Sequence, residues 1–252
     1  MPTSNDQRPV ALITGSGTGV GRACAVQFAA RGYDVVINYS RSKSEAEATA
    51  ESVAASGGRV LVQPCDVSDD QAVRSMLTVV EAEFGRLDVL VNNAATTHFV
   101  DHQDLEGMTE AMWDRILDVN LKGPFFVTRA ASKLLTAGNG GAVVNVSSVA
   151  AESGKGSSIA YCASKAGLNT TTKSLARVLA PKVRVNAVCP GPIDSRWIRQ
   201  GNPNWAIEKM VAGFPIPRAS QPSDIADVVI FLAIDAKMVT GQLLFVDGGQ
   251  LL

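Results

Sequence analysis

The sequence predicts an α/β fold, in which a doubly wound, Rossmann-type parallel sheet of seven strands carries helices on both faces. Short β-branched runs alternate with longer segments of helical spacing, the pattern of repeated β-α-β units. The runs are apolar throughout, as strands covered on both faces require. No internal repeat and no linker rich in glycine, serine or proline divides the 252 residues, so we expect a single domain over residues 1–252.

Seven short runs are expected to form the strands, and six longer segments the main helices. The strands cover Val10–Ile13, Asp34–Ile37, Arg59–Val62, Asp88–Val91, Ala142–Val146, Val183–Val188 and Leu243–Val246. The helices cover Gly19–Arg31, Lys43–Ala55, Asp69–Phe84, Met112–Thr136, Ile159–Ala180 and Ser223–Ile234. Ser68, with Gln71 three residues on, indicates a capping box before the third helix. Pro222 is typical of the first turn of the last helix.

Charge balance and the length of the apolar runs exclude several classes of function. Lys and Arg number 23 against 24 Asp and Glu, so the net charge is −1 and the basic stripe of a nucleic-acid-binding protein is absent. The apolar runs stop well short of the ~18 residues of a membrane span, and the polar start over residues 1–9 lacks the apolar core of a secretory signal. We therefore expect a cytoplasmic protein without a membrane or nucleic-acid partner.

Cysteine and histidine positions argue against a disulfide framework and against a metal site. The four cysteines are spread along the chain without a Cys-x-x-Cys pair, at Cys24, Cys65, Cys162 and Cys189. His98 and His102 follow the fourth strand, but no third ligand stands at a workable spacing for zinc. The sequence therefore predicts free thiols, solvated loop histidines and no bound metal.

A glycine-rich turn joins the first strand to the first helix. It reads TGSGTGVG over Thr14–Gly21. Glycines let the chain turn sharply and let the backbone approach a pyrophosphate, while the helix N-terminus offers free N–H groups and the positive end of its dipole. Any tight strand-to-helix turn also uses glycine, but the strand before it and the β-α-β continuation favour a dinucleotide site.

The end of the second strand indicates which dinucleotide is bound. In this fold an acid there binds the adenosine ribose hydroxyls and repels a 2′-phosphate. The segment from Asn38 to Lys43 contains no acid but carries Ser40 and Arg41, and a guanidinium pairs a phosphate through two hydrogen bonds. These residues favour NADP(H), with NAD(H) still open. The alternative is that Arg41 is a solvated loop residue.

Tyr161 and Lys165 are candidates for acid–base chemistry. They stand four residues apart in a helical segment and therefore share one face. A free tyrosine has a pKa of ~10, and a nearby ammonium lowers it. A tyrosine tuned in this way gives a proton to a carbonyl oxygen or takes one from an alcohol. A Tyr-x3-Lys pair is common by chance, and the alternative for Tyr161 is a half-buried helix tyrosine.

Eight motifs in order make the chain resemble the short-chain dehydrogenase/reductase family from Ala11 to Gly249. They are TGSGTGVG at Thr14–Gly21, CDV at Cys65–Val67, NNAA at Asn92–Ala95, DVN ending at Asn120, NVSS at Asn145–Ser148, YCASK at Tyr161–Lys165, PGPIDS at Pro190–Ser195 and VDGG at Val246–Gly249. Within that family the chain is most similar to 3-oxoacyl-carrier-protein reductases and related NADPH-dependent carbonyl reductases.

The resemblance implies a catalytic set of Asn120, Ser148, Tyr161 and Lys165. Ser148 would hold the carbonyl oxygen, Tyr161 would exchange the proton, and Lys165 would lower the pKa of Tyr161 and bind the nicotinamide ribose. Asn120 would hold a water in a proton relay through Lys165, unless it is a helix-interior asparagine bonded to the backbone. Neighbouring strand side chains point to opposite faces, so only one of Ser147 and Ser148 reaches the site, and the family register selects Ser148.

The resemblance also implies a cofactor-binding set. Its members are Gly15, Ser16, Thr18, Gly19, Val20, Asn38, Ser40, Arg41, Asp66, Val67, Asn93, Ala94, Tyr161, Lys165, Ile193 and Ser195. Asp66 and Val67 would meet the adenine, although Asp66 could equally be the N-terminal acid of the following helix. The Asn93–Ala94 pair would line the ribose, and Ile193 with Ser195 would touch the nicotinamide carboxamide. Thr18 stands where many NADP-dependent relatives have arginine, so the phosphate preference depends on Arg41 and its neighbours.

The expected reaction is hydride transfer between NADP(H) and a small-molecule carbonyl or alcohol substrate, in the ketone-reducing direction and with Tyr161 as general acid. Enoyl reductases of the same superfamily often space their tyrosine and lysine seven apart, so a spacing of four favours C=O over C=C reduction. Two alternatives stay open: a dinucleotide-binding sensor or scaffold without catalysis, and an NAD-dependent alcohol or sugar dehydrogenase. Neither the pocket segments nor any motif indicates the substrate.

Residues 192–217 are expected to be an insertion that builds the substrate pocket together with residues 96–104. Trp197, Trp205 and Phe214 form either a lid over the substrate or the insertion's own packing. Met112–Thr136 and Ile159–Ala180 are long helices. The second has small or apolar residues on more than one face, a surplus that suggests a subunit interface: Ala163, Ala166, Leu168, Leu175, Ala176 and Leu179. Because the family often pairs these helices across twofold axes, we expect a homo-oligomer, namely a tetramer.

Overall fold

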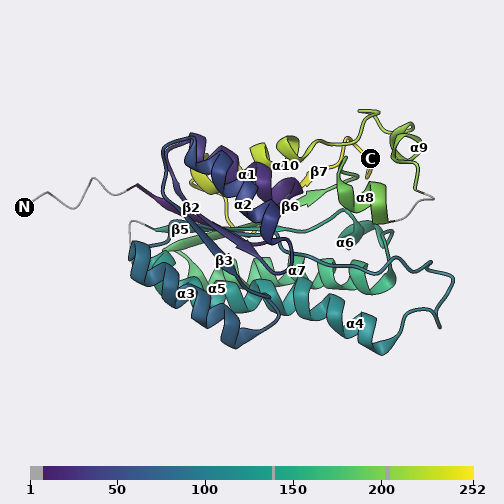
Figure 1. Ribbon diagram of the computed structural model, residues 1–252. Coiled ribbons are helices and arrows are strands. Elements are labelled where there is room, and N and C mark those ends of the chain that lie inside the picture. Colours follow the sequence, from purple (N-terminus) through teal and green to yellow (C-terminus); the bar gives the residue numbers. More distant parts are fainter. Residues whose placement is uncertain (1–7, 138–139, 202–204) are drawn as a thin grey trace, which may run out of the picture.

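Seven parallel strands form one sheet in the computed structural model, which describes residues 8–137, 140–201 and 205–252 (Figure 1). The strands are β1 (Val10–Ile13), β2 (Asp34–Tyr39), β3 (Val60–Pro64), β4 (Val89–Asn92), β5 (Gly141–Val146), β6 (Val183–Pro190) and β7 (Leu243–Val246). Their order across the sheet is β3-β2-β1-β4-β5-β6-β7. The predicted doubly wound, Rossmann-type sheet is confirmed.

The strand order reverses between β1 and β4, in the middle of the sheet. Both neighbours of β1 are parallel to it, and Ile13 lies opposite Ile37 of β2 and Val91 of β4. From this point the chain builds outward in one direction through β2 and β3 and in the other through β5, β6 and β7. The connections after β1 and β4 diverge, which opens a crevice at the carboxyl ends of these two strands.

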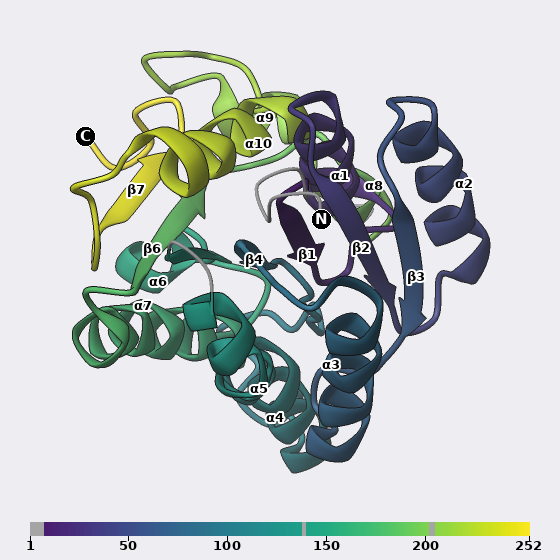
Figure 2. The same ribbon diagram turned by 90° about the vertical axis from the view of Figure 1, so that its left-hand side faces the viewer.

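Helices cover both faces of the sheet, as Figure 2 shows. One face carries α1 (Gly19–Ala30), α2 (Lys43–Ala54) and α10 (Pro222–Ile230). The other carries α3 (Asp70–Phe84), α4 (Glu110–Leu117), α5 (Gly123–Ala137) and α7 (Ile159–Leu179). Each layer has its own core, with Phe28 and Ile13 in the first and Met76 and Leu12 in the second. No helix among the described residues is long and apolar enough to cross a membrane.

The segment Met112–Thr136, predicted as one helix, is divided. α4 ends at Leu117, a π-helical turn, η1, covers Asp118–Lys122, and α5 follows from Gly123. Pro124 explains the break, because it has no N–H to donate to the carbonyl four residues before it. Gly123 fits close packing there, since a Cβ on it would lie 2.8 Å from a methyl group of Val67. An apolar periodicity that runs through both helices does not reveal this turn.

Two helix ends also differ from the prediction. Asp69, not Ser68, caps α3: its Oδ1 accepts hydrogen bonds from the backbone N–H groups of Gln71 and Ala72, at 2.9 and 3.0 Å. α10 ends at Ile230, and a second π-helical turn, η2 (Phe231–Asp235), replaces its expected last turn. Pro222 does lie in the first turn of α10, as predicted.

The predicted insertion at residues 192–217 contains two short helices. They are α8 (Arg196–Gly201) and α9 (Ile207–Val211), and they lie at the carboxyl end of the sheet, near α6 (Ala150–Ser153) (Figure 1). The expectation of a polar start without a signal falls partly on residues 1–7, and part of the insertion falls on residues 202–204. Both stretches lie outside the described residues.

Candidate active site

A cavity of about 980 Å³ lies at the crevice between the two halves of the sheet. That volume is at the upper end of the ~300–1,000 Å³ typical of ligand and cofactor sites. The cavity is lined by the glycine-rich turn, the ends of β2, β4, β5 and β6, the start of α7 and the α8–α9 segment. Every predicted site residue lines it except Ser16 and Asn120.

Glycines in the turn after β1 are required by backbone conformation and by close approach. Gly15 and Gly19 have φ angles of +63° and +55°, in the left-handed region that glycine favours. A Cβ on Gly21 would lie 2.5 Å from the carbonyl oxygen of Gly15 and 2.6 Å from the amide nitrogen of Asn93. Asn93 donates from that nitrogen to the carbonyls of Thr14 and Gly15, both at 3.0 Å, and so ties β4 to the turn.

The N-terminus of α1 fits an anionic group. α1 begins at Gly19, and the Thr18 side chain forms no capping hydrogen bond. Its first turn carries no acidic side chain. Backbone N–H groups there therefore stay available, next to the positive end of the helix dipole, and they lie in the cavity wall. This arrangement fits the pyrophosphate of a dinucleotide.

The side chains of Ser16 and Asn38 hold the turn in place, and Asn38 also lines the cavity. The Ser16 hydroxyl is buried, donates to the carbonyl of Ile13 at 2.9 Å and accepts from the backbone N–H of Asn38 at 3.1 Å. Asn38 accepts from the Gly15 N–H with Oδ1 and donates to the carbonyl of Cys65 with Nδ2, both at 3.1 Å. These hydrogen bonds satisfy buried backbone groups around the cavity, which need a partner, and the contacts of Ser16 and Asn38 with the cofactor stay predictions.

The corner of the cavity next to β2 suits a phosphate. Ser40 and Arg41 are exposed and line the cavity together with Ser42. The nearest acid in the sequence, Glu45, binds Arg196 of α8 at 3.0 Å, and this hydrogen bond holds the pKa of Glu45 below its usual value. Glu45 therefore stays ionised and directed to the α8 segment, and Arg41 forms no ion pair with any described residue.

Asp66 is paired with an arginine that sequence reasoning missed. Its Oδ2 lies 2.7 Å from Arg115 of α4, and its Oδ1 accepts from the Ser68 hydroxyl at 2.7 Å. Partial burial would raise the pKa of Asp66, but the hydrogen bonds from Arg115 and Ser68 outweigh it and lower the pKa. No sequence signal marks Arg115, which reaches Asp66 only through the packing of α4 beside the cavity.

Tyr161 and Lys165 lie one turn apart at the start of α7, as predicted. Ser158 caps this helix, its hydroxyl accepting from the Tyr161 N–H at 3.3 Å. Lys165 is buried, and its ammonium donates to the carbonyl of Val146 at 2.8 Å. The ammonium nitrogen lies 5.7 Å from the centroid of the Tyr161 ring. Helix α7 and the end of β5 thus fix the relative position of the two groups.

The predicted tuning of Tyr161 is wrong for this geometry. Burial raises the pKa of Tyr161 to about 12, with the Ser148 side chain acting in the opposite direction. Burial also lowers the pKa of Lys165 to about 8. The ammonium is directed at the Val146 carbonyl, so desolvation, which disfavours the charged form of each group, dominates both values.

Ser147 and Ser148, which follow β5, make different hydrogen bonds, although both residues line the cavity. Ser147 is buried and its hydroxyl donates to the backbone carbonyl of Lys165 at 3.3 Å. Ser148 is half-buried in the cavity wall, and its hydroxyl oxygen accepts from the Ala150 N–H at 3.1 Å. The Ser148 side chain also hydrogen-bonds to Tyr161, which brings the two hydroxyls together at the place where a carbonyl oxygen would bind.

Asn120 is fully buried in η1 and does not line the cavity. Its Oδ1 accepts from the Thr96 N–H at 2.8 Å, and its Nδ2 donates to the Thr96 carbonyl and to Ser164, at 3.0 and 3.1 Å. The side chain fastens the segment after β4 to α7. These contacts are those of the backbone-bonded asparagine that was the alternative, with the backbone supplied by Thr96, and the water-holding role stays a prediction.

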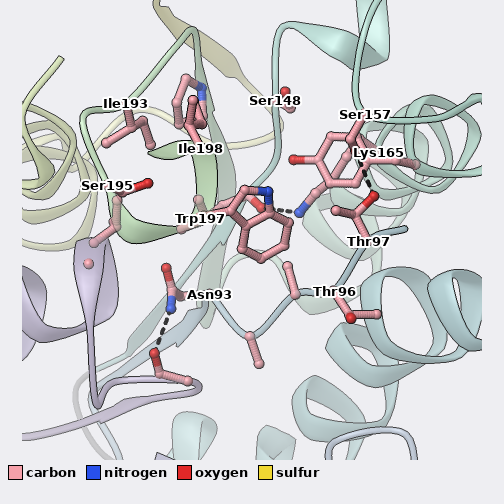
Figure 3. A pocket seen from close by; sticks show the side chains of 18 of the residues that line it. Asn93, Thr96, Thr97, Ser148, Ser157, Lys165, Ile193, Ser195, Trp197 and Ile198 are labelled. Atoms are coloured by element: carbon pink, nitrogen blue, oxygen red, sulfur yellow. Dashed lines mark hydrogen bonds between the residues drawn. The ribbon is translucent and has the colours of Figure 1, made fainter. Parts of the chain in front are cut away.

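The aromatic residues of the insertion belong to the cavity wall. The wall includes Trp197, Trp205 and Phe214. Figure 3 shows Trp197 projecting into the cavity, near Lys165. The Trp197 ring lies 6.4 Å from that of Tyr161. Ile193 and Ser195, which follow β6, also line the cavity, and their contact with the nicotinamide carboxamide stays a prediction.

Within the described residues no group of histidine, cysteine, aspartate or glutamate side chains could hold a metal ion. His98 and His102 are half-buried rather than solvated, and Nε2 of His102 is buried without a described hydrogen-bond partner. All four cysteines are buried and free.

Comparisons with known proteins find matches that cover nearly the whole chain. The family model described as enoyl-(acyl carrier protein) reductase matches residues 15–250. The chain is 40% identical over 250 residues to ketoacyl reductase 2 of the granaticin polyketide synthase of Streptomyces violaceoruber, covering 99% of this chain and 98% of that one. It is 41% identical over 242 residues to the 3-oxoacyl-(acyl-carrier-protein) reductase of Staphylococcus aureus, covering 95% and 97%. A crystal structure described as a short-chain dehydrogenase/reductase from Burkholderia xenovorans superposes with a TM-score of 0.91 at 36% identity, covering 98% and 99%.

The dinucleotide crevice and the Ser–Tyr–Lys group beside it define an oxidoreductase that uses a nicotinamide dinucleotide and acts on carbonyl or hydroxyl groups. The chain belongs to the short-chain dehydrogenase/reductase family. The alternative of a sensor or scaffold without catalysis therefore loses its support.

Proposed function

We propose that this protein reduces a ketone with NADPH, with Tyr161 as the general acid. The observation that carries the proposal is the convergence of Ser148, Tyr161 and Lys165 on the cavity that also holds the glycine-rich turn and Arg41. The ketoacyl-reductase names of the relatives agree with it. Incubation with NADPH and a panel of ketones, followed by loss of NADPH absorbance, tests it. A protein that binds NADPH but consumes none across the panel would refute it.

A bound nicotinamide dinucleotide would supply the hydride. The chain's residues position the carbonyl and move the proton. The Ser148 hydroxyl donates a hydrogen bond to the carbonyl oxygen and stabilises the charge that develops there. The Tyr161 hydroxyl gives its proton to the same oxygen. Lys165, whose ammonium is held by the Val146 carbonyl, places a positive charge beside the phenolate that remains.

The raised pKa of Tyr161 favours the reducing direction. With a pKa of about 12, the phenol keeps its proton at neutral pH and is ready to donate it. Oxidation of an alcohol needs the phenolate as base, and burial makes the phenolate costly. The acid role in reduction is thus the one that the site supports without further activation.

We predict a loss of activity in alkaline solution. Because burial lowers the pKa of Lys165 to about 8, the ammonium is present below that pH and is lost above it. Its neighbour Cys189, whose pKa burial raises to about 11, stays neutral in this range. The kcat of reduction should therefore be level near neutrality and fall above about pH 8. The low remaining kcat of Lys165→Met should no longer fall above about pH 8. The kcat of Lys173→Met, a variant on the same helix, should still fall there. A wild-type kcat constant up to about pH 10 would contradict the assignment.

The cofactor preference is tested at Arg41. Arg41→Asp removes the guanidinium and adds an anion where we place the 2′-phosphate. A lost charge-assisted hydrogen bond costs ~1.5–3 kcal/mol, so the KM for NADPH should rise at least ~10-fold while that for NADH changes little. Arg31→Asp, the same charge change at the far end of α1, should leave both values unchanged. A wild type that already prefers NADH would refute the role of Arg41.

The oligomer, the cellular compartment and the domain boundaries stay predictions. Leu168 and Ala176 of α7, counted in its surplus apolar face, are buried in the chain's own fold. Phe125 of α5 and Ile159 and Val178 of α7 remain exposed, at 40%, 39% and 76%, and support a subunit interface. We infer a homotetramer in the cytoplasm, with a single domain whose residues 192–217 form the substrate segment.

A further inference from the structure

Four aromatic residues line the cavity together with Tyr161, and we define them as its aromatic wall: Phe99, Trp197, Trp205 and Phe214. Phe99 comes from the segment after β4, and the other three come from the α8–α9 segment. Two of the three tryptophans of the chain stand in this wall. Such a concentration of rings is more than a cover requires, because any apolar side chains would exclude water.

The rings of the wall are arranged for contact with a further ring. Phe99 and Trp205 pack edge to face, with centroids 5.2 Å apart and an interplanar angle of 86°. Trp197 lies on the α8 side, 6.4 Å from Tyr161 and tilted by 57°. The Trp197 side chain is 38% exposed although it faces the cavity, so part of its indole has no cover from the described chain.

The polar groups beside the aromatic wall are few and mostly neutral. The hydroxyls of Thr97 and Ser157 lie 2.6 Å apart and line the cavity, as Figure 3 shows. The Thr97 hydroxyl donates to the backbone carbonyl of His98 at 3.2 Å, so Ser157 donates to Thr97 and the two hydroxyls offer a ligand their free lone pairs. Of the cations that line the cavity, Arg196 is bound to Glu45 and Lys155 is exposed. The site thus offers aromatic surface and hydroxyl contacts rather than a buried counter-charge.

We propose that the substrate is a rigid aromatic ketone, such as a fused bicyclic one. Its carbonyl would lie at Ser148 and Tyr161, its rings between Trp197 and the Phe99–Trp205 pair, and a hydroxyl substituent at Thr97 and Ser157. Aromatic pairs prefer offset and edge-to-face contacts and are worth more than the apolar area that they bury. A rigid ring system also loses little conformational freedom on binding. This inference rests on the proposed ketone reduction and adds the substrate class.

The test compares 2-tetralone with 2-decalone, its saturated counterpart. In both ketones the carbonyl is not conjugated to the ring, so reactivity is similar and ring character differs. Binding to the complex with NADP⁺, which cannot reduce a ketone, is measured by calorimetry. Two new aromatic contacts predict at least ~10-fold tighter binding of 2-tetralone. Trp197→Leu should reduce this preference to less than threefold, whereas Trp113→Leu, a tryptophan of α4 outside the cavity, should leave it unchanged.

The outcomes separate this inference from the proposed function. Equal affinities for the two ketones, or an undiminished preference in Trp197→Leu, would overturn the aromatic substrate class even if both ketones are reduced. Absence of reduction of any ketone with NADPH would overturn the proposed function, while the binding ratio would still decide the inference. Trp205→Leu provides a second variant if Trp197→Leu does not fold, and it should lower the preference in the same direction.

Discussion

Tyr161→Phe should lower the turnover of a ketone by ~10²-fold or more, which is the scale of a lost general acid. The change removes one oxygen and keeps the ring, so packing against Trp197 and the fold of α7 should be preserved. Affinity for NADPH, measured by fluorescence, should stay near the wild-type value. Turnover and affinity must be measured together, because only their separation assigns a chemical role to the hydroxyl.

Tyr39→Phe is a matched control for that variant. Tyr39 also lines the cavity, but at the end of β2, in the part assigned to the adenosine half of the cofactor. Its hydroxyl has no part in the proposed proton transfer, so turnover should change little. Undiminished turnover in Tyr161→Phe would remove Tyr161 from the mechanism. A Tyr161→Phe protein that also fails to bind NADPH would mean that the hydroxyl shapes the site instead.

Gly21→Ala should weaken NADPH binding by ~30-fold. An added Cβ would lie 2.5 Å from the Gly15 carbonyl oxygen and 2.9 Å from Cα of Ser16, and these backbone atoms cannot swing away. Overpacking of this kind costs ~1–3 kcal/mol, and ~2 kcal/mol expressed in binding corresponds to the stated factor. Helix propensity alone predicts the opposite sign for stability, since alanine is favoured over glycine in a helix by ~1 kcal/mol.

The control for this variant is Gly213→Ala, at an exposed glycine where an added Cβ meets nothing within 4 Å. It should leave NADPH affinity unchanged. Thermal unfolding of both variants shows whether the effect falls on the turn or on the whole fold. Wild-type affinity in Gly21→Ala would mean that the turn adapts without cost, and the close approach of the backbone would then not explain the glycine.

The strands and their parallel arrangement were predictable because each is a short apolar run in a β-α-β alternation. The polar ends of the strands were not predictable in the same way. β2 continues to Tyr39 because Asn38, a poor strand former, satisfies backbone groups of the turn and of the neighbouring segment through its side chain. The sequence also did not reveal that η1 divides the long helix, because apolar spacing shows which face of a helix is buried and not how each backbone carbonyl is bonded.

The candidate site was predictable as a set of positions but not as a set of roles. Motifs placed Ser148, Tyr161 and Lys165, and the structure brings all three into one cavity. They could not show that the Lys165 ammonium is directed at the Val146 carbonyl, nor that desolvation governs both pKa values. Those facts depend on how α7 packs against the end of β5.

Residues that act through tertiary packing left no local signal. Arg115 reaches Asp66 from a helix that is distant in sequence, and Phe99 completes the aromatic wall from a different loop than Trp205. Ser16 was named from the glycine-rich turn and Asn38 from the end of the second strand, and neither position revealed that the two side chains bond to each other's segments.

The central claim is that the site reduces C=O and not C=C bonds with NADPH. It is tested most directly with two thioesters that differ only in the reducible group, 3-oxobutyryl and crotonyl, and with 2-tetralone, by following NADPH absorbance. Tyr161 four residues from Lys165, with Ser148 beside it, predicts NADPH consumption with at least one of the two ketones and none with crotonyl thioester. Turnover of the crotonyl thioester, with none of either ketone, would contradict it.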